Sequence, residues 1–412
     1  MIAQFVQEHL NDDTARLILD RAKWPQIDID LAVNCIESRR KLKGKVQQWY
    51  DNPDLIFPLK LSAEQCSSAV TGEYKAAFAD FIYNHDRSQQ DRKLRIADLT
   101  GGYGVDSWSF SKVAEKVLYC EMLEKLCEAA KHNFSALKAE NIHIENIAIS
   151  PDNFPVGILS EFHPDIIYLD PARRSETGRK VFLIEDCTPD VLTLKDLLFA
   201  QCRHILLKLS PMADINMVCE RLGEHCREVR VVAMGGECKE LLIWMDREWS
   251  GEYSISAVEL SNNSETAESF DFTPSEEKSS IVKIASKEEI AEAEYIYEPG
   301  KALMKAGAFN TICQRFGLAK LGRSTHYYII GKGAAIPSLG KTYRILSSFP
   351  LDKRSIKTVG QSYPKSEVTA RNIPMDTETL RKKLGITSGD DAHIFGLKSD
   401  TAGNLLIVTS RI

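Results

Sequence analysis

The chain has 412 residues, more than one ordinary domain holds, and this length predicts two to four folded units. Hydrophobic residues make up 43% and charged residues 27% of the chain, with a net charge of −6, a balance that excludes disordered and fibrous proteins. No stretch approaches the roughly 18 consecutive apolar residues of a membrane span, and the first residues lack the pattern of a secretory signal. We therefore expect a cytoplasmic protein with no membrane partner.

The ten cysteines form no Cys-x-x-Cys pair, and several lie in apolar stretches where a thiol acts as a small hydrophobic group. The nine histidines show no metal-ligand spacing. These patterns predict reduced, buried thiols and no bound metal.

The first segment, residues 1–85, is predicted to be helical. Apolar residues recur at helical spacing from Phe5 to Ala22 and again from Leu31 to Trp49. The basic run from Arg39 to Lys45 either contacts phosphates or forms the solvated face of a helix, and the second alternative is the more common one.

Residues 86–250 alternate short apolar runs with longer helical patterns. Strands are predicted at Leu94–Leu99, Lys116–Cys120, Ile142–Asn146, Ile166–Leu169, His204–Leu209, Glu228–Met234 and Glu240–Met245. Helices are predicted between them, notably at Val105–Ala114, Glu124–Ala139 and Met212–Leu222. Seven strands with crossover helices predict an α/β fold with a mainly parallel, doubly wound, Rossmann-like sheet. Gly235 and Gly236 join the last two strands and predict a terminal antiparallel hairpin.

The units predicted beyond residue 250 are small. Residues 251–330 hold a polar loop or linker from Ser261 to Ser275, followed by a compact turn-helix unit at Ala291–Phe316. Residues 331–412 predict a second α+β module, with strands at Tyr343–Ser347, His393–Leu397 and Leu405–Thr409 and a helix near Glu378–Leu384.

Charge is distributed unevenly over these two segments. From Gly251 to Glu298 there are three basic and twelve acidic residues, whereas eighteen basic and seven acidic residues follow from Pro299 onward. A basic segment on an acidic protein is a candidate surface for a polyanion, unless the acidic and basic modules face each other.

The strongest motif is a glycine loop that follows the first predicted strand of the sheet. Asp98 ends this strand, and a helix follows after Thr100, Gly101, Gly102 and Gly104. Glycine allows positive φ and lets a ligand approach the backbone closely. Ser107 stands where a dinucleotide fingerprint would have its third glycine, and no Gly-Lys-Ser/Thr follows as a phosphate loop requires.

Two acidic residues near the glycine loop indicate which kind of ligand it binds. Asp98 would repel a pyrophosphate but attract the ammonium or sulfonium group of a methionine-derived cofactor. Glu121 follows the second strand, where α/β nucleoside binders hold ribose hydroxyls with a carboxylate. Together with the glycine loop, these acids favour S-adenosylmethionine over a purely structural turn.

A second motif lies at the carboxyl end of the fourth predicted strand, where open α/β sheets place their sites. Asp170 and Pro171 follow this strand directly, and the proline fixes the backbone after the carboxylate. Arg173 and Arg174 come next and can pair with phosphate or carboxylate in bidentate fashion.

The glycine loop, Glu121 and the run Asp170-Pro171-Ala172-Arg173 together resemble the class I S-adenosylmethionine-dependent methyltransferases. The Asp-Pro element is similar to the Asp/Asn-Pro-Pro-x motif of enzymes that methylate exocyclic or amide nitrogens, and to the Asp-Pro-Pro-Arg of some RNA methyltransferases. The whole chain resembles an uncharacterised bacterial methyltransferase family with a ferredoxin-like insert and a C-terminal THUMP-like domain. The strings that carry this resemblance are Glu64–Ser68, Asp170–Arg174, Lys208–Met212, Glu298–Gly300 and Thr325–Tyr328.

The resemblance implies a seven-stranded methyltransferase sheet in residues 86–250, a ferredoxin-like module in 251–330 and a THUMP-like module in 331–412. It also implies that Asp170 and Pro171 present the acceptor nitrogen. The implied cofactor-binding residues are Asp98, Thr100, Gly101, Gly102, Gly104, Asp106 and Glu121, with Asn146 near adenine and Gln65, Ser67 and Thr71 over the methionine moiety. The candidate substrate-binding residues are Arg173, Arg174, Ser210 and Pro211.

The last segment interleaves aromatic and basic residues, a mixture that suits RNA but also occurs where core aromatics alternate with an ordinary basic surface. The aromatics are Tyr327, Tyr328, Tyr343, Phe349 and Tyr363, and the basic residues are Lys332, Lys341, Arg344, Lys353, Arg354, Lys357 and Lys365. The THUMP-like resemblance favours RNA, with tRNA first. Cys238 is interpreted as structural because no base is near it, and His326 as packed or RNA-facing.

The leading hypothesis is therefore an S-adenosylmethionine-dependent methyltransferase acting on a base nitrogen in RNA (tRNA or rRNA). The alternatives are a methyltransferase acting on a protein or small molecule, and a non-catalytic RNA-binding protein with a methyltransferase-like scaffold.

Overall fold

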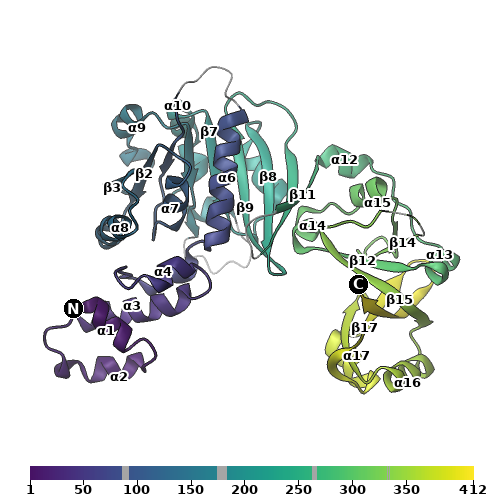
Figure 1. The fold of residues 1–412 in the computed structure, drawn as a ribbon. Coiled ribbons are helices and arrows are strands. Elements are labelled where there is room, and N and C mark those ends of the chain that lie inside the picture. The colour runs from purple at the N-terminus through teal and green to yellow at the C-terminus, as the bar shows by residue number, and fades with distance from the viewer. Residues whose placement is uncertain (86–91, 174–182, 262–266, 332, 334) are drawn as a thin grey trace. The chain divides into compact units, whose positions relative to one another are not determined.

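The computed structural model describes residues 1–412 except 86–91, 174–182, 262–266, 332 and 334 (Figure 1). It contains two compact units. The first is formed mainly by Met1–Val229 and Glu240–Gly251, and the second by Arg230–Lys239, Glu252–Ser261 and the chain beyond residue 266. The division into four segments expected from the sequence stays a prediction.

A sheet of nine strands, in the order β11-β10-β8-β9-β7-β4-β1-β2-β3, has the predicted Rossmann-like character. Neighbouring strands from β3 to β7 run parallel, and β9 runs antiparallel to β7. The strands are β1 (Arg95–Asp98), β2 (Lys116–Glu121), β3 (Ile142–Asn146), β4 (Ile166–Leu169), β7 (His204–Leu209), β8 (Cys226–Met234), β9 (Glu237–Asp246), β10 (Ser254–Leu260) and β11 (Ala267–Phe272). The seven predicted strands are all present, and a two-stranded sheet of β5 (Ala172–Arg173) and β6 (Cys187–Thr188) is separate.

The strand count departs from the prediction at β10 and β11, which pair antiparallel. The prediction of a polar loop from Ser261 to Ser275 was wrong in part, because β11 lies inside it. Only Phe270 and Phe272 of this strand are buried. Two apolar residues at a period of two are a weak signal in an acidic stretch, which explains why the pattern predicted a loop.

The hairpin predicted between the last two strands is present, with Gly235 and Gly236 between β8 and β9. Their φ values of 63° and 81° are those of a two-residue type I′ turn, which glycine adopts without strain.

Helices follow most of the parallel strands, as a doubly wound sheet requires. They are α7 (Val105–Ser111), α8 (Glu124–Ala136), α9 (Val156–Phe162), α10 (Val191–Gln201) and α11 (Ile215–Leu222). A further helix, α6 (Ala69–His85), precedes β1 and lies along the sheet (Figure 1). Its Phe78 packs edge-on against Trp244 of β9 with ring centroids 6.2 Å apart, so the apolar face of α6 is held on the sheet.

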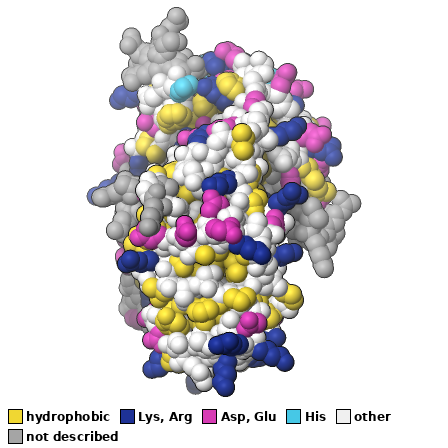
Figure 2. All heavy atoms as spheres, turned by 90° about the vertical axis from the view of Figure 1, so that its right-hand side faces the viewer, with side chains coloured by type: hydrophobic (Ala, Val, Ile, Leu, Met, Phe, Trp, Pro, Cys, Tyr) yellow, Lys and Arg dark blue, Asp and Glu magenta, His cyan; other side chains and the backbone are white. Residues whose placement is uncertain are grey.

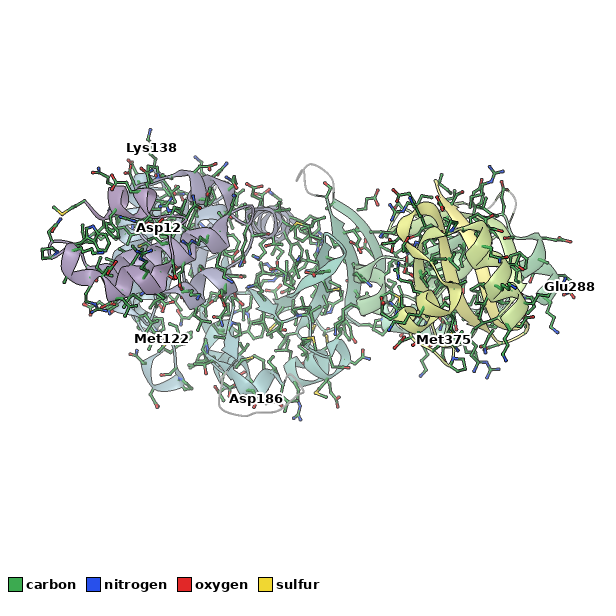
Figure 3. The ribbon with its side chains drawn as sticks, turned by 90° about the horizontal axis from the view of Figure 1, so that it is seen from below. Asp12, Met122, Lys138, Asp186, Glu288 and Met375 are labelled. Carbon is green, nitrogen blue, oxygen red and sulfur yellow. The ribbon has the colours of Figure 1, made fainter. Side chains whose placement is uncertain are left out.

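The predicted N-terminal helical region is present as one cluster of short helices in the first unit, seen from below in Figure 3 with Asp12 labelled. The helices are α1 (Ile2–Glu8), α2 (Thr14–Leu19), α3 (Ile29–Leu42), α4 (Gln47–Asp51) and α5 (Lys60–Gln65). Their buried residues share one hydrophobic core with Tyr103, Trp108 and Phe134, which belong to the glycine loop, α7 and α8. The N-terminal helices therefore support the loop that follows β1.

The basic run from Arg39 to Lys45 contributes to this packing. Arg39 is 3% exposed, and its guanidinium donates to the main-chain oxygens of Tyr50, Asn52, Pro53 and Leu55. Neither sequence interpretation, a phosphate contact or a solvated face, holds for Arg39. A guanidinium carries five N–H donors in a fixed plane, which lets one side chain hold four carbonyls of a turn.

We expect Arg39→Met to lower the free energy of unfolding by about 3 kcal/mol, because it leaves buried carbonyl oxygens without a donor. Arg40→Met is the matched control, since Arg40 also donates to two carbonyls but from an exposed position, and it should cost less than about 1 kcal/mol. Urea denaturation measures both, and equal losses for the two variants would contradict the structural role of Arg39.

The second unit contains a seven-stranded sheet in the order β13-β14-β12-β15-β18-β17-β16. Its strands are β12 (Tyr295–Pro299), β13 (Ala319–Lys320), β14 (Tyr328–Ile330), β15 (Gly340–Pro350), β16 (Lys365–Arg371), β17 (Thr387–Ser399) and β18 (Gly403–Arg411). Its helices are α12 (Pro274–Ser279), α13 (Lys287–Glu292), α14 (Lys301–Ala306), α15 (Thr311–Phe316), α16 (Lys353–Ser362) and α17 (Thr377–Leu384). The predicted C-terminal strands and helix are present, whereas α16 and β16 were not predicted.

The aromatic residues that were predicted as candidates for stacking on RNA lie mostly in the core of this unit. Tyr327, Tyr328 and Tyr343 are each no more than 5% exposed. The hydroxyl of Tyr327 donates to Glu298, and the hydroxyl of Tyr328 donates to the main-chain oxygen of Phe309. These three tyrosines therefore match the alternative of core aromatics beneath a basic surface.

Candidate functional site

The glycine loop turns sharply between β1 and α7, and its glycines serve two purposes. A Cβ on Gly101 would lie 2.2 Å from the ring of Tyr119, and a Cβ on Gly104 would lie 2.4 Å from the ring of Phe134. Gly102 has φ of 55° and only one atom, the oxygen of Thr100, within 4 Å of such a Cβ. Gly101 and Gly104 thus allow close packing beneath the loop. Gly102 faces open space, where a ligand can approach the backbone.

Asp98 ends β1 and is 1% exposed. Its carboxylate accepts hydrogen bonds from Thr100 N at 3.0 Å and Ser107 Oγ at 2.6 Å, and no cation among the described residues pairs with it. Burial raises its pKa to about 7, with Asp106 and Asp170 nearby adding to the effect.

Asp246 shows what a buried acid does in this unit when cations are present. It is equally buried, at 1% exposure, but Arg203 and Arg227 donate to it from 2.8 Å. Burial opposes ionisation, but these hydrogen bonds outweigh it and lower the pKa of Asp246 to about 2. The two buried acids therefore differ in their partners: Asp246 has bonded cations, whereas Asp98 has only neutral donors among the described residues.

Glu121 lies at the end of β2 and holds the glycine loop from the neighbouring strand. One carboxylate oxygen accepts from Gly102 N and the other from Leu123 N, both at 2.9 Å. Each oxygen keeps a further lone pair for another donor. Asn146 ends β3 beside it and donates to the main-chain oxygen of Glu121 at 2.9 Å.

Asp170 follows β4, and two groups fix its position. Its main-chain N–H donates to Thr100 Oγ1 at 2.6 Å, which connects the Asp-Pro motif to the glycine loop. Lys208 Nζ, from the neighbouring strand β7, donates to Oδ2 of its carboxylate. The structure thus brings together two predicted motifs that lie about seventy residues apart in the sequence.

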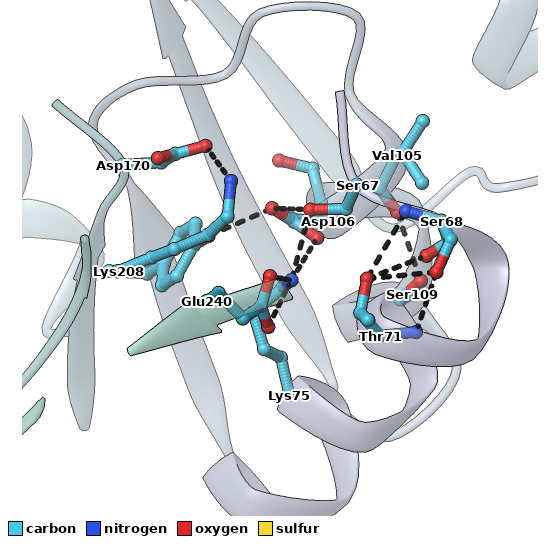
Figure 4. Close-up of polar contacts among 12 residues, drawn as sticks. Ser67, Ser68, Thr71, Lys75, Val105, Asp106, Ser109, Asp170, Lys208 and Glu240 are labelled. Atoms are coloured by element: carbon cyan, nitrogen blue, oxygen red, sulfur yellow. Dashed lines mark hydrogen bonds and ion pairs between the residues drawn. The ribbon is translucent and has the colours of Figure 1, made fainter. Parts of the chain in front are cut away.

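Beside this pair lies a buried network of charges around Lys75 of α6 (Figure 4). Lys75 is 0% exposed, and its Nζ lies 2.9 Å from Glu240 Oε1, 3.2 Å from Asp106 Oδ1 and 2.9 Å from Ser67 Oγ. Asp106 also accepts from Ser67 Oγ at 2.9 Å and from Tyr168 Oη at 2.8 Å. Burial alone would raise the pKa of Asp106, but Lys75 and Lys208 lower it.

The remaining predicted residues differ in their surroundings. Asp106 and Ser67 point their polar groups into the Lys75 network, and Thr71 hydrogen-bonds with Ser68 at the start of α6. Gln65 is exposed at the end of α5, Pro171 is buried behind Asp170, and Ser210 accepts from Met212 N just after β7, followed by Pro211. The main chain of Arg173 lies in β5, and Arg174 lies outside the described residues.

Three residues of this region were missed by the sequence analysis as site residues: Lys75, Lys208 and Glu240. Lys208 interrupts the buried run of β7, and Glu240 is the first residue of the buried run of β9. A charged side chain at the carboxyl end of an apolar strand is the signal that could have found Lys208. Lys75 gave no comparable signal, because its partner Glu240 lies 165 residues away.

Other candidate groups lie apart from these motifs. Burial raises the pKa of the Cys238 thiol, which donates to the main-chain oxygen of Lys301, so the structural interpretation of this cysteine fits. His326 stacks on Phe309 with ring centroids 3.7 Å apart, and burial lowers its pKa to about 4. A cleft of about 430 Å³ in the N-terminal region, lined by Cys35, Arg39 and His132 among others, contains none of the predicted site residues.

Among the described residues, no three or more His, Cys, Asp or Glu side chains are grouped so as to hold a metal ion. In the same part of the chain, no helix has the length and apolar character needed to cross a membrane.

We expect Lys75→Met to lower the free energy of unfolding by about 3–5 kcal/mol, because it leaves Asp106 and Glu240 buried without their cation. The loss should be smaller at pH 5.5 than at pH 8, since burial then favours the protonated acids. The double variant with Glu240→Gln should recover part of the loss, as contacting groups are not additive. Chemical denaturation at both pH values tests this, and a pH-independent loss without recovery would contradict the network.

Two family models match the second unit. The model of a ferredoxin-like domain matches residues 295–333, and the model of a THUMP domain-like module matches residues 340–411. The two matched segments contribute to one sheet, because β12 of the first pairs with β15 of the second. None of the curated proteins matches the sequence.

Solved structures show where the whole fold occurs. A "putative methyltransferase" from Porphyromonas gingivalis W83 is 29% identical, with a TM-score of 0.84 over 100% of this chain and 97% of that chain. A modification subunit of a putative type I restriction enzyme from Vibrio vulnificus YJ016 (10% identity, 51% and 56% of the chains, TM-score 0.31) also matches. A putative methyltransferase from Streptococcus mutans in complex with SAH also matches, with 12% identity over 42% of this chain and 96% of that chain and a TM-score of 0.29.

The TM-scores of the Vibrio and Streptococcus proteins are below 0.5, so neither bears on this fold. The Porphyromonas protein and the two family models do bear on this fold. Together they cover the sheet, the ferredoxin-like domain and the THUMP-like domain. The resemblance predicted from the motifs is thereby confirmed: along its whole length the chain resembles a "putative methyltransferase", and its second unit matches the models of a ferredoxin-like domain and a THUMP domain-like module.

Proposed function

We propose that the chain is an S-adenosylmethionine-dependent methyltransferase that modifies a base nitrogen in RNA, with tRNA favoured. The observation that carries the cofactor is Asp98, a buried carboxylate with no cation partner among the described residues, next to a glycine loop with open space at Gly102. A sulfonium or ammonium group supplies the missing positive charge. The likeness to the Porphyromonas protein, which is named a "putative methyltransferase", supports the same chemistry.

The residues around the loop fit this cofactor in three respects. Among the described residues, the four acids Asp98, Asp106, Asp170 and Glu240 outnumber Lys75 and Lys208, the two lysines that bond to members of this group, and a sulfonium would offset this imbalance. Glu121 keeps lone pairs for ribose hydroxyls. The Gly102 backbone leaves room for the methionine moiety, which a side chain there would reduce.

The cofactor supplies an electrophilic methyl group, and transfer requires an acceptor lone pair aligned with it. Asp170 can accept an N–H from the acceptor through the carboxylate oxygen that Lys208 leaves free, and so orient the nitrogen lone pair. The same oxygen can take the proton that the nitrogen loses after methylation. Pro171 fixes φ directly after this carboxylate, and Thr100 holds its main chain, so its position is set before the substrate binds.

RNA is the proposed substrate because the THUMP-like module exposes a basic surface. Figure 2 shows Lys and Arg side chains gathered at the end of the second unit that carries α16 and α17. A cleft of about 520 Å³ between these helices is lined by Lys353, Lys357 and Lys383 around Ile356 and Leu384. Exposed lysines on an apolar floor can bind a phosphate backbone together with an unstacked base.

The titration of Asp98 gives a test of cofactor binding. With a pKa of about 7, this carboxyl is mostly protonated at pH 6 and mostly ionised at pH 8. A cationic ligand prefers the ionised form, so affinity should fall about tenfold from pH 8 to pH 6, with a proton released on binding at the lower pH. Calorimetry with S-adenosylmethionine in buffers of different ionisation enthalpy measures both effects.

Asp98→Asn is the control, because it keeps the shape of the side chain and removes its charge. This variant should bind more weakly and lose the dependence on pH. No binding by the wild type would overturn the cofactor proposal, and affinity that is constant between pH 6 and pH 8 would remove Asp98 from it.

The substrate is tested by methyl transfer from labelled cofactor to total cellular RNA. We expect label in RNA with the wild type and at least about a hundredfold less with Asp170→Ala, because the acceptor loses its orienting group. Label found only in protein or in small molecules would replace RNA by that substrate class. Cofactor binding without any transfer would favour a non-catalytic RNA-binding scaffold.

A further inference from the structure

We infer that Lys208 is a positioning residue, which binds one oxygen of the Asp170 carboxylate and so directs the other oxygen to the substrate. The inference rests on the proposed function for its effect on methyl transfer. It goes beyond that function because it defines what Asp170 can recognise: a group that donates an N–H.

The two residues meet because of the strand register. β4 and β7 are parallel neighbours in which Leu169 lies opposite Leu207, so Asp170 and Lys208 each follow a paired residue at the same edge of the sheet. Lys208 is the only charged residue in the His-Ile-Leu-Leu-Lys-Leu run of β7, apart from the titratable His204 at its start. The fold therefore places a lysine beside the Asp-Pro motif without any flexible segment between them.

Lys208 is mostly buried, with 12% of its side chain exposed, whereas the Asp170 side chain is 33% exposed. An ammonium that is withdrawn from water needs a bonded partner. Lys208 Nζ finds it in Asp170 Oδ2, while Glu240 and Asp106 are already bound by Lys75. Oδ1 of Asp170 has no hydrogen-bond partner within the described part of the chain, so it is the oxygen available to a substrate.

The bond to Lys208 determines how Asp170 can bind a substrate. A carboxylate bound to an ammonium accepts hydrogen bonds and does not donate them. With Oδ2 held by Lys208 and the main chain held by Thr100, only the direction of Oδ1 remains for recognition. This arrangement selects an amino or amide N–H over a carbonyl oxygen or a tertiary ring nitrogen as the acceptor.

Other ionisable groups face the pair from the surrounding elements. The acids are Asp98 on β1, Asp106 on α7 and Glu240 on β9. The other groups are Lys75 on α6, Tyr168 on β4, and Lys45 and Cys66 in the N-terminal region. Burial alone would lower the pKa of Lys208, but Asp170, followed by Glu240 and Asp106, raises it. Removing the Asp170 charge should therefore leave a lysine that loses its proton at a lower pH.

The first experiment needs no substrate. ¹⁵N NMR of lysine side chains follows the Lys208 titration in the wild type and in Asp170→Asn, with the signal assigned by its absence in Lys208→Met. We expect a lower pKa of Lys208 in Asp170→Asn than in the wild type. An identical titration in both proteins would overturn the ion pair and with it the inference.

The second experiment measures single-turnover methyl transfer with saturating S-adenosylmethionine. Lys208→Met should slow transfer at least about a hundredfold while cofactor affinity stays within about twofold, and Lys208→Arg should restore part of the rate. The acidic limb of the pH–rate profile should move to higher pH in Lys208→Met, because the carboxylate then lacks the cation that is bonded to it in the wild type.

Lys195→Met is the matched control, because Lys195 of α10 is also part-buried and donates to the main-chain oxygen of Leu222, outside the Lys75 network. It should leave the rate and the pH profile unchanged. If Lys208→Met behaves like Lys195→Met, the positioning role is overturned. If the wild type transfers no methyl group, the proposed function fails, whereas the NMR titration still decides the Lys208–Asp170 pair.

Discussion

The site depends on one buried ammonium group, that of Lys75. It connects α6, α7 and β9, which come from three separate parts of the chain, through Glu240, Asp106 and Ser67. Buried charges of one sign are tolerated only when a partner offsets the loss of hydration. If Lys75 were neutral, the two acids would repel each other and the carboxylates of Asp98 and Asp170 next to them, so the negative character of the site depends on it.

This network divides the charged residues into two kinds. Asp106 and Glu240 have fixed cationic partners, which makes them part of the framework, while Asp98 has only neutral hydrogen-bond donors among the described residues. Lys75 lowers the pKa of Asp106 and opposes the rise that burial causes at Glu240. Asp98 has no such cation, and burial raises its pKa to about 7, so a positively charged ligand would stabilise its ionised form. Under the proposed function, a cationic cofactor is therefore expected to act on Asp98, at the end of β1, more than on the more heavily bonded Asp106 of α7.

The sequence predicted the sheet well because its signals are local. Short apolar runs separated by helical patterns identified all seven strands, and Gly235-Gly236 identified the hairpin. The glycine loop and the Asp-Pro motif were also visible, since each occupies consecutive positions. β11 was missed because two buried phenylalanines in an acidic stretch carry little periodicity. Arg39 was misinterpreted because a charged residue reveals neither its burial nor its carbonyl partners from spacing alone.

What local patterns cannot give is the pairing of distant charges. Lys208 meets Asp170 across 38 residues, and the pairing follows from strand order, which no single segment encodes. Yet that pairing determines the chemistry, because an isolated half-exposed carboxylate could either donate or accept a proton, whereas one bound to a buried ammonium can only accept. The Asp-Pro motif by itself therefore identifies where an acceptor nitrogen would lie. If Asp170 receives the acceptor as proposed, Lys208 on the neighbouring strand requires that this nitrogen carry a hydrogen to donate.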